Sequence, residues 1–248
     1  MKLFFHIGRY FMLMSRVFQR PQKFRVYGRQ IIFEIDAMGI SSLPIVAIIS
    51  VFMGGIIAIQ TASNIDNPLI PRYTIGFTVR ESIMLEFSPT VVCLILAGKI
   101  GSNIASEIGA MRITEQIDAL EIMGINSAGY LIFPKIAAAI LIFPVLIALS
   151  MFLGISGGYL MACLPSAAFS TYDYVFGIQA FFDPGKLYYS FTKVLVFAFI
   201  ITSVSSYYGY HTSGGALEVG KSSTNAVVYS SILILLFSLI LTYLFLIR

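Results

Sequence analysis

The sequence predicts an all-α integral membrane protein with about five transmembrane helices, an N-terminal interfacial helix and a short amphipathic helix on the cytoplasmic side. Of its 248 residues, 58% are hydrophobic and only 11% are charged, whereas a soluble domain has about a quarter charged residues. Its polar surface is too small to cover a soluble globule, and the same composition excludes a disordered chain. Two cysteines, Cys93 and Cys163, lie inside apolar runs and indicate neither a disulfide framework nor a metal site.

Five apolar stretches are long enough to cross a bilayer, which requires about 20 residues of helix. The second stretch is interrupted by Arg80, Glu81 and Glu86, and the third has enough surplus length for tilt or a short re-entrant end. Together they fill most of the chain, so we expect a single domain over residues 1–248. The stretches are about 43–65, 75–101, 130–164, 187–208 and 226–247.

The first 42 residues have a different composition, because seven of the sixteen basic residues lie there among aromatic ones. The segment lacks the apolar centre and cleavage site of a signal peptide. A basic and aromatic segment with Pro21 midway is typical of one or two helices lying on an anionic leaflet. A loosely ordered basic tail is the alternative. The basic residues are Lys2, Arg9, Arg16, Arg20, Lys23, Arg25 and Arg29.

This basic excess sets the expected topology, because cytoplasmic segments of membrane proteins are enriched in lysine and arginine. The N-terminus is therefore expected in the cytoplasm. Five crossings then place residues 102–129 and 209–225 inside, and residues 165–186 and the C-terminus outside. The outer segment contains two aspartates and one lysine, which agrees with this orientation.

After the second span comes a polar segment that, from Arg112 onward, has the periodicity of an amphipathic helix ending at Gly124. It is too short and too acidic to span a membrane, and anionic headgroups would repel its acidic face. We therefore interpret it as a helix that binds a groove of a partner protein; a solvated helix packing on its own bundle is the alternative. The apolar stripe consists of Ile113, Ile117 and Leu120, and the acidic face of Glu115, Asp118 and Glu121.

Charged residues inside the second span are candidate functional groups, because each costs at least about 2.5 kcal/mol to insert. Glu86 lies midway, with Pro89 one turn later, where a kink and freed carbonyls are expected. We expect Glu86 to be functional and to line a cavity. A buried glutamate that is neutral or paired and fixes helix packing is the alternative. Arg80 and Glu81 are expected among the outer headgroups, and Lys99 is expected to snorkel.

Several sequence strings resemble the signature of the MlaE-type permease family, and the resemblance covers roughly residue 43 to the C-terminus. These proteins are membrane subunits of bacterial ABC transporters that move phospholipids together with MCE-domain proteins. Lys99 stands where the family often has arginine, and Leu85 and Ser88 replace an arginine and a glycine that commonly flank the glutamate. The strings are Ala-Gly-Lys-Ile-Gly at 97–101, Ala-Ser-Glu-Ile-Gly-Ala-Met-Arg at 105–112, Thr-Glu-Gln-Ile-Asp-Ala-Leu at 114–120, Leu-Glu-Phe-Ser-Pro at 85–89 and Gly-Gly-Ala-Leu-Glu-Val-Gly at 214–220.

The resemblance implies two sets of functional residues in this chain. Residues 107–124 would form the coupling helix that docks onto an ABC ATPase subunit, and the end of the first span would line a lipid cavity at a two-fold dimer interface. Arg112, Glu115, Gln116, Asp118 and Glu121 would face the ATPase, while Ile117 and Leu120 would anchor the helix. The implied lipid contacts are Ile57, Gln60, Thr61, Asn64 and Ile65, to which the argument above adds Glu86.

The first span also contains features that suit such a cavity. Gly54 and Gly55, midway along it, permit close approach of another backbone. Its polar end is followed by Pro68 and Pro71, which break helices.

The implied function is a non-enzymatic permease half in the bacterial inner membrane. Its partners would be an ATPase, a periplasmic MCE-domain protein, phospholipid and a second copy of the chain, with no cofactor, metal or nucleic acid. A proton-coupled secondary carrier of lipids or other hydrophobic substrates, with Glu86 as its proton site, is the alternative. An intramembrane lipid-modifying enzyme would need a catalytic constellation, which the sequence does not show. His6 and His211 are too isolated to form a metal or catalytic pair.

One motif points elsewhere. Residues 215–222 fit the phosphate-binding pattern Gly-x-x-x-x-Gly-Lys-Ser. Such a loop must join a buried strand to a helix within a parallel sheet. The short connection between two spans leaves no room for one, so nucleotide binding is not expected here.

Overall fold

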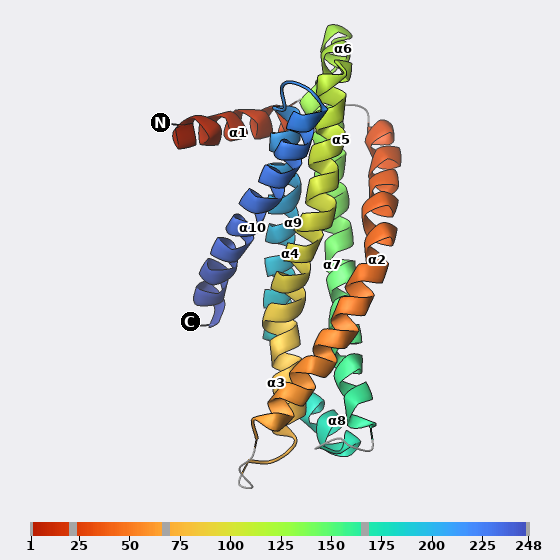
Figure 1. The fold of residues 1–248 in the computed structure, drawn as a ribbon, viewed down its shortest axis with the longest axis vertical. Helices are drawn as coiled ribbons and strands as arrows, with labels where there is room; N and C mark the ends of the chain where they lie inside the picture. The colour runs from red at the N-terminus through yellow and green to blue at the C-terminus, as the bar shows by residue number, and fades with distance from the viewer. Residues whose placement is uncertain (1, 20–23, 66–69, 165–168, 247–248) are drawn as a thin grey trace. The chain divides into compact units, whose positions relative to one another are not determined.

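The computed structural model describes residues 2–19, 24–65, 70–164 and 169–246, and within these ranges it contains helices and no strand (Figure 1). Arg20, Pro21, Lys23 and Pro68 lie outside the described residues. The helices are α1 (Lys2–Phe18), α2 (Phe24–Ser63), α3 (Thr74–Ser82), η1 (Ile83–Val92), α4 (Cys93–Leu96), η2 (Ala97–Gly101), α5 (Ser102–Ile113), α6 (Gln116–Ile122), α7 (Ser127–Ala162), α8 (Thr171–Gln179), α9 (Pro184–Tyr210) and α10 (Ala216–Leu246).

Five helical stretches among the described residues are long and apolar enough to cross a membrane, which confirms the predicted fold class. They are longer than the predicted spans because polar turns continue the same helices. The first begins at Tyr27, well before the predicted residue 43, and continues through Pro44. The second continues to Ile113. The stretches are Tyr27–Ser63, Thr74–Ile113, Ser127–Ala162, Pro184–Tyr210 and Ala216–Phe245.

The chain divides into two compact units, which we describe separately. Unit 1 comprises Met1–Ser41, Leu94–Phe143 and Leu195–Arg248, and unit 2 comprises Ser42–Cys93 and Pro144–Val194. That the whole chain acts as one permease domain stays a prediction.

In unit 1, α1 packs on α9, and α5 packs on α9 and α10. The Nδ1 atom of His6 lies 2.8 Å from the Tyr207 hydroxyl, and the Tyr10 hydroxyl donates to Ser203 over 2.8 Å. A Cβ atom at Gly209 would lie 2.8 Å from the Ala105 carbonyl oxygen, so glycine is needed for this close helix contact. The predicted N-terminal helix is thus present as α1, tied to the bundle by two polar side chains.

In unit 2, glycines bring α2 and α7 into backbone contact, as the Gly54-Gly55 pair predicted. A Cβ atom at Gly54 would lie 1.8 Å from the Gly154 carbonyl oxygen, and one at Gly157 would lie 2.1 Å from the Val51 carbonyl oxygen. The buried Ser150 hydroxyl bonds to Ser50 over 2.8 Å and to Ser88 over 3.0 Å. Small residues and hydroxyls are the usual means of joining helices in lipid, where burial of apolar groups contributes little.

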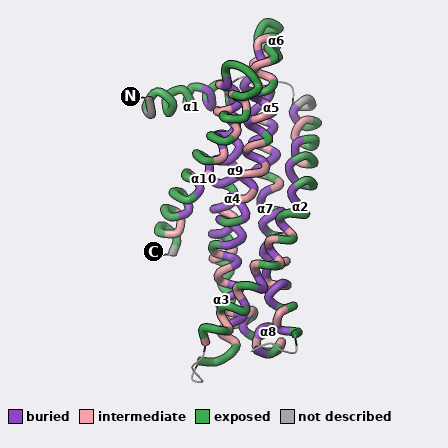
Figure 2. Tube along the Cα trace, in the orientation of Figure 1, coloured by how far each residue is buried: buried purple, intermediate pink, exposed green. Residues whose placement is uncertain are grey.

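Many residues of α10 are exposed (Figure 2), and large apolar ones are among them. Of the most apolar 18 residues of α10, only 17% are buried inside the chain, whereas 61% are buried in the corresponding segments of the second and fourth stretches. In a soluble protein a patch of this size would promote aggregation. In a membrane protein it is the surface that lipid or another transmembrane chain covers.

Candidate functional site

The segment expected to dock a partner is two helices instead of one. Glu115 has a φ of 58°, in the left-handed region, and separates α5, which ends at Ile113, from α6, which begins at Gln116. The Thr114 hydroxyl donates to the Ala110 carbonyl over 2.8 Å and closes α5. The prediction of one continuous helix over 107–124 was therefore wrong, because apolar periodicity does not show a single left-handed residue.

The predicted end of the segment at Gly124 is confirmed. Gly124 has a φ of 76°; its N–H donates to the Glu121 carbonyl over 2.9 Å, and the N–H of Ile125 donates to the Leu120 carbonyl over 3.0 Å. These two bonds form a Schellman motif, which satisfies the last carbonyls of a helix and requires a residue that tolerates positive φ.

The break at Glu115 changes which side chains α6 presents. Ile117 is fully buried within the chain and Leu120 is half-buried, so the apolar stripe holds α6 on its own unit. Ile122 and Met123 are instead 88% and 65% exposed. Sequence reasoning missed this exposed apolar pair, although its position just before the glycine stop was a usable signal.

Three of the predicted partner-facing side chains already have bonds inside unit 1. Arg112 pairs with Asp118 at 2.5 Å. Glu121 accepts hydrogen bonds from Ser127 and Tyr210, each over 2.9 Å, which fixes α6 to α7 and α9. Of the predicted set, Glu115, Gln116 and Glu121 are exposed.

An ion-pair triad centred on a buried lysine also lies in unit 1, and sequence reasoning did not find it. The Lys135 ammonium on α7 lies 2.6 Å from Glu34 on α2 and 2.8 Å from Glu107 on α5. Lys135 is 2% exposed. The signal was a lone lysine inside an apolar span, but its partners are 101 and 28 residues away. Lys99 extends to the Ser41 carbonyl oxygen.

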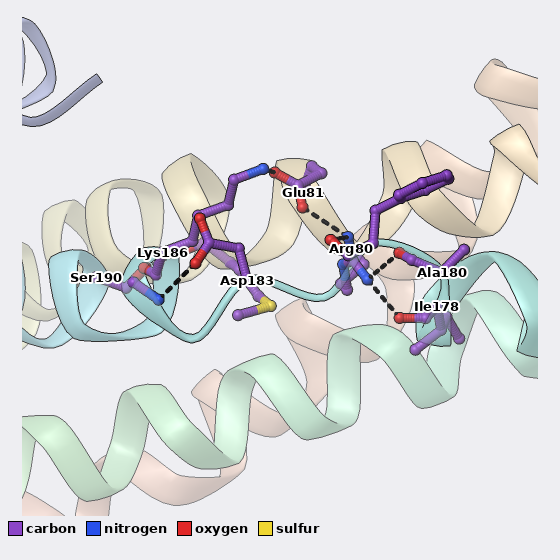
Figure 3. A network of polar contacts seen from close by, with 10 residues as sticks. Arg80, Glu81, Ile178, Ala180, Asp183, Lys186 and Ser190 are labelled. Atoms are coloured by element: carbon purple, nitrogen blue, oxygen red, sulfur yellow. Dashed lines mark hydrogen bonds and ion pairs between the residues drawn. The ribbon is translucent and has the colours of Figure 1, made fainter. Parts of the chain in front are cut away.

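In unit 2, Arg80 is fully buried, so the expectation that it sits among headgroups was wrong (Figure 3). Its guanidinium donates to three backbone carbonyls at the end of α8 and just beyond it, over 2.6, 2.8 and 3.2 Å, and to the Glu81 carboxylate over 2.8 Å. Glu81 also pairs with Lys186 at 2.6 Å. A planar guanidinium can bind several acceptors at once, which an ammonium does less well. The acceptors are the carbonyls of Ile178, Ala180 and Phe181.

Glu86 lies in a widened helical segment, η1, and is paired. The fully buried Lys193 ammonium on α9 lies 2.9 Å from its carboxylate and donates to the Leu85 carbonyl over 3.3 Å. In the π-helical η1 the N–H of residue i+5 binds the carbonyl of residue i, so Pro89, which has no N–H, frees the carbonyl of Met84. The freed carbonyl expected here is therefore present, and the Ser190 hydroxyl donates to it over 2.5 Å. Half of the Glu86 side chain, 51%, stays exposed, which leaves it able to contact a ligand. Thr90 also donates to Glu86, over 3.1 Å.

The implied lipid contacts of the first span share one flank of α2 and the turn after it, at spacings of three and four residues. Gln60 and Asn64 are exposed, whereas Ile57, Thr61 and Ile65 are partly exposed. The flank therefore combines polar and apolar groups beside the packed Gly54 face.

The phosphate-loop pattern lies mostly within a helix. Residues 216–222 form the first turns of α10, where Lys221 pairs with Glu218 at 2.6 Å and the Ser222 hydroxyl donates to the Tyr208 carbonyl over 2.6 Å. Its backbone N–H groups beyond the first turn are used within the helix, so they do not form a phosphate cradle.

These features define a multi-pass α-helical membrane protein whose charged groups are joined across its helices. Residues 31–244 match the family described as permease MlaE, and the chain belongs to that family. It is 36% identical over 231 residues to a probable ABC transporter permease protein of Rickettsia bellii, covering 93% of this chain and 87% of that protein. A similarly named protein of Rickettsia prowazekii is 34% identical over 235 residues, covering 95% and 88%. One from a Synechocystis species is 32% identical over 236 residues, covering 94% and 88%. The chain is thus an ABC transporter permease subunit.

Proposed function

We propose that this permease subunit moves phospholipids between the bacterial inner membrane and a periplasmic MCE-domain protein, while a separate subunit hydrolyses ATP. In this proposal the working unit is a homodimer and α6 is the cytoplasmic segment that each ATPase holds. Hydrolysis would shift the dimer between two states of a lipid cavity that differ in their affinity for lipid.

The observation that carries the proposal is the exposed apolar pair at the end of α6, Ile122 and Met123. Two large apolar side chains in a polar connection are unfavourable in water and are typical of the central contacts of a protein interface. The neighbouring Glu115 and Gln116 are exposed and supply a polar rim. A groove on an ATPase would therefore accept this tip.

The attachment of α6 suits transmission of force. Ile117 is buried in unit 1, and Glu121 bonds to α7 and α9 through Ser127 and Tyr210. Displacing α6 would therefore displace the adjoining ends of α5, α7 and α9, which belong to three different membrane-crossing stretches.

Two features of unit 2 support a lipid as the cargo. The flank of α2 and of the turn after it, from Ile57 to Ile65, combines polar and apolar groups, which suits a ligand with both a headgroup and acyl chains. The half-exposed Glu86 carboxylate supplies a charged group within a membrane-crossing stretch.

The proposal is tested by co-purification with an ABC ATPase subunit that is produced together with this chain. The double variant Ile122→Asp/Met123→Asp should insert normally and lose the ATPase, and Leu120→Arg should do the same. Leu217→Asp changes an equally exposed apolar residue at the start of α10 and should retain the ATPase. Undiminished co-purification of the double variant would contradict the assignment. Lipid transport that follows the proton gradient without any ATPase would favour the secondary carrier instead.

A further inference from the structure

A pocket of about 440 Å³ lies in unit 1 between α1 and the connection from α9 to α10. Its charged lining is mainly positive, with three guanidinium groups and one carboxylate. Polar groups of the connection complete it. The charged residues are Arg9 and Arg16 from α1, Arg112 from α5 and Glu121 from α6; the other lining residues are Met12, Leu13, Tyr210, His211, Thr212 and Ser213.

The two arginines of α1 are available to a ligand. Among the described residues neither Arg9 nor Arg16 forms an ion pair, whereas Arg112 pairs with Asp118 and Glu121 is held by Ser127 and Tyr210. Arg9 and Arg16 are seven residues apart, two helical turns, so both point to the pocket side of α1. A planar guanidinium group can donate two parallel hydrogen bonds to two oxygens of one phosphate, so a cluster of arginines is suited to binding phosphate.

The pKa of His211 also indicates that the positive charges around the pocket lack a neutralising partner. Burial lowers the pKa of the His211 imidazole, although its hydrogen bond to the Tyr207 carbonyl opposes this effect. Arg9, Arg112 and His6 lower the pKa further, because each disfavours a second positive charge nearby. An anion in the pocket would relieve this repulsion.

The opposite flank of α1 indicates where the anion comes from. Phe4, Phe11 and Phe18 also repeat every seven residues, and they are 78%, 66% and 57% exposed. A helix with a buried stripe, an arginine flank and an open aromatic flank is suited to the membrane interface, where the rings reach acyl chains. A headgroup phosphate would then lie at the level of the arginines.

We propose that this pocket binds the phosphate of an anionic phospholipid headgroup, held by Arg9 and Arg16 and completed by Arg112 and the Ser213 hydroxyl. The site is separate from the flank of α2 that is proposed to contact transported lipid. It adjoins α6 through Arg112 and Glu121, but it does not depend on α6 binding an ATPase.

The test uses the full-length chain in an uncharged detergent and follows its thermal unfolding midpoint. Dihexanoyl phosphatidylglycerol, dihexanoyl phosphatidylcholine and inorganic phosphate are titrated separately, since a ligand that binds the folded state raises the midpoint in a saturable way. Phosphatidylglycerol alone should do so. Equal effects of the two lipids would overturn the proposal, and a saturable effect of inorganic phosphate alone would overturn the lipid source.

Variants then place the effect in the pocket. Arg9→Gln/Arg16→Gln should weaken the apparent affinity for phosphatidylglycerol about a hundredfold, because each of the two lost charged hydrogen bonds contributes about tenfold. Arg29→Gln removes an exposed arginine of α2 outside the pocket and should leave the affinity unchanged. Ser213→Glu adds a negative charge to the pocket without altering α1 and should abolish the effect. Retained affinity in Ser213→Glu, or equal weakening in Arg29→Gln, would contradict the assignment.

Discussion

Replacing Arg80 tests whether a single guanidinium holds the end of α8 to α3. Arg80→Gln removes four hydrogen bonds, three to backbone carbonyls and one to Glu81, while Glu81 keeps its pairing with Lys186. Hydrogen bonds to charged groups contribute about 1.5–3 kcal/mol each. They are not additive, and breaking a buried charged network costs about 3–5 kcal/mol.

At about 2–4 °C per kcal/mol for a chain of this size, the thermal unfolding midpoint should fall by about 6–20 °C. The purified protein is heated in detergent to a series of temperatures, and the fraction that remains folded is measured by size-exclusion chromatography. Arg80→Lys should show a smaller but clear decrease, because an ammonium keeps the charge but loses the planar fork.

Arg72→Gln is the matched control, since Arg72 is an exposed arginine in the same unit. Its thermal unfolding midpoint should equal that of the wild type. If Arg80→Gln also melts within about 2 °C of the wild type, a shift of less than about 1 kcal/mol, the network does not stabilise the fold and the reasoning is refuted.

Three further predictions concern other sites. Glu86→Ala should lower the melting midpoint and impair the outer-membrane barrier against detergent. Adding Lys193→Met removes the charge that Glu86→Ala leaves unpaired, so the double variant should regain the midpoint but not the barrier. Recovery of both would indicate that Glu86 has a packing role alone. Gly157→Ala should destabilise the fold by about 1–3 kcal/mol in the same melting assay, because its Cβ would lie 2.1 Å from a carbonyl oxygen of α2, whereas Gly8→Ala, with open space around it, should not. Because burial lowers the pKa of His211, the folded state favours the neutral ring, so stability is complete above about pH 6.5 and is lost as the pH falls toward the lowered pKa. His211→Gln should therefore show a smaller decrease in melting midpoint between pH 7 and pH 5, and an unchanged decrease would contradict this.

The five membrane-crossing helices could be predicted because hydrophobicity over about 20 residues is a local property of the sequence. The close contact at Gly54 and the freed carbonyl near Pro89 were also predictable, since each follows from the chemistry of one residue type. The Gly124 stop belongs to the same class.

The charged networks could not be predicted, because their partners lie far apart in the sequence. Lys193 and Glu86 are 107 residues apart, and Arg80 binds carbonyls about 100 residues away. The break at Glu115 was missed for a different reason, since glutamate has no special preference for positive φ that a pattern could reveal. The missed break changed the candidate site, because the exposed apolar contacts of α6 are Ile122 and Met123 instead of the predicted stripe.

The most direct test of the account is site-specific photo-crosslinking from α6. A benzoylphenylalanine is introduced at Met123 in cells that express the complete transporter, and the cross-linked product is identified by mass spectrometry. The account predicts a cross-link to the ATPase subunit that is absent when the probe is placed at Leu217. A product that contains a periplasmic protein would place α6 on the other side of the membrane and contradict the account.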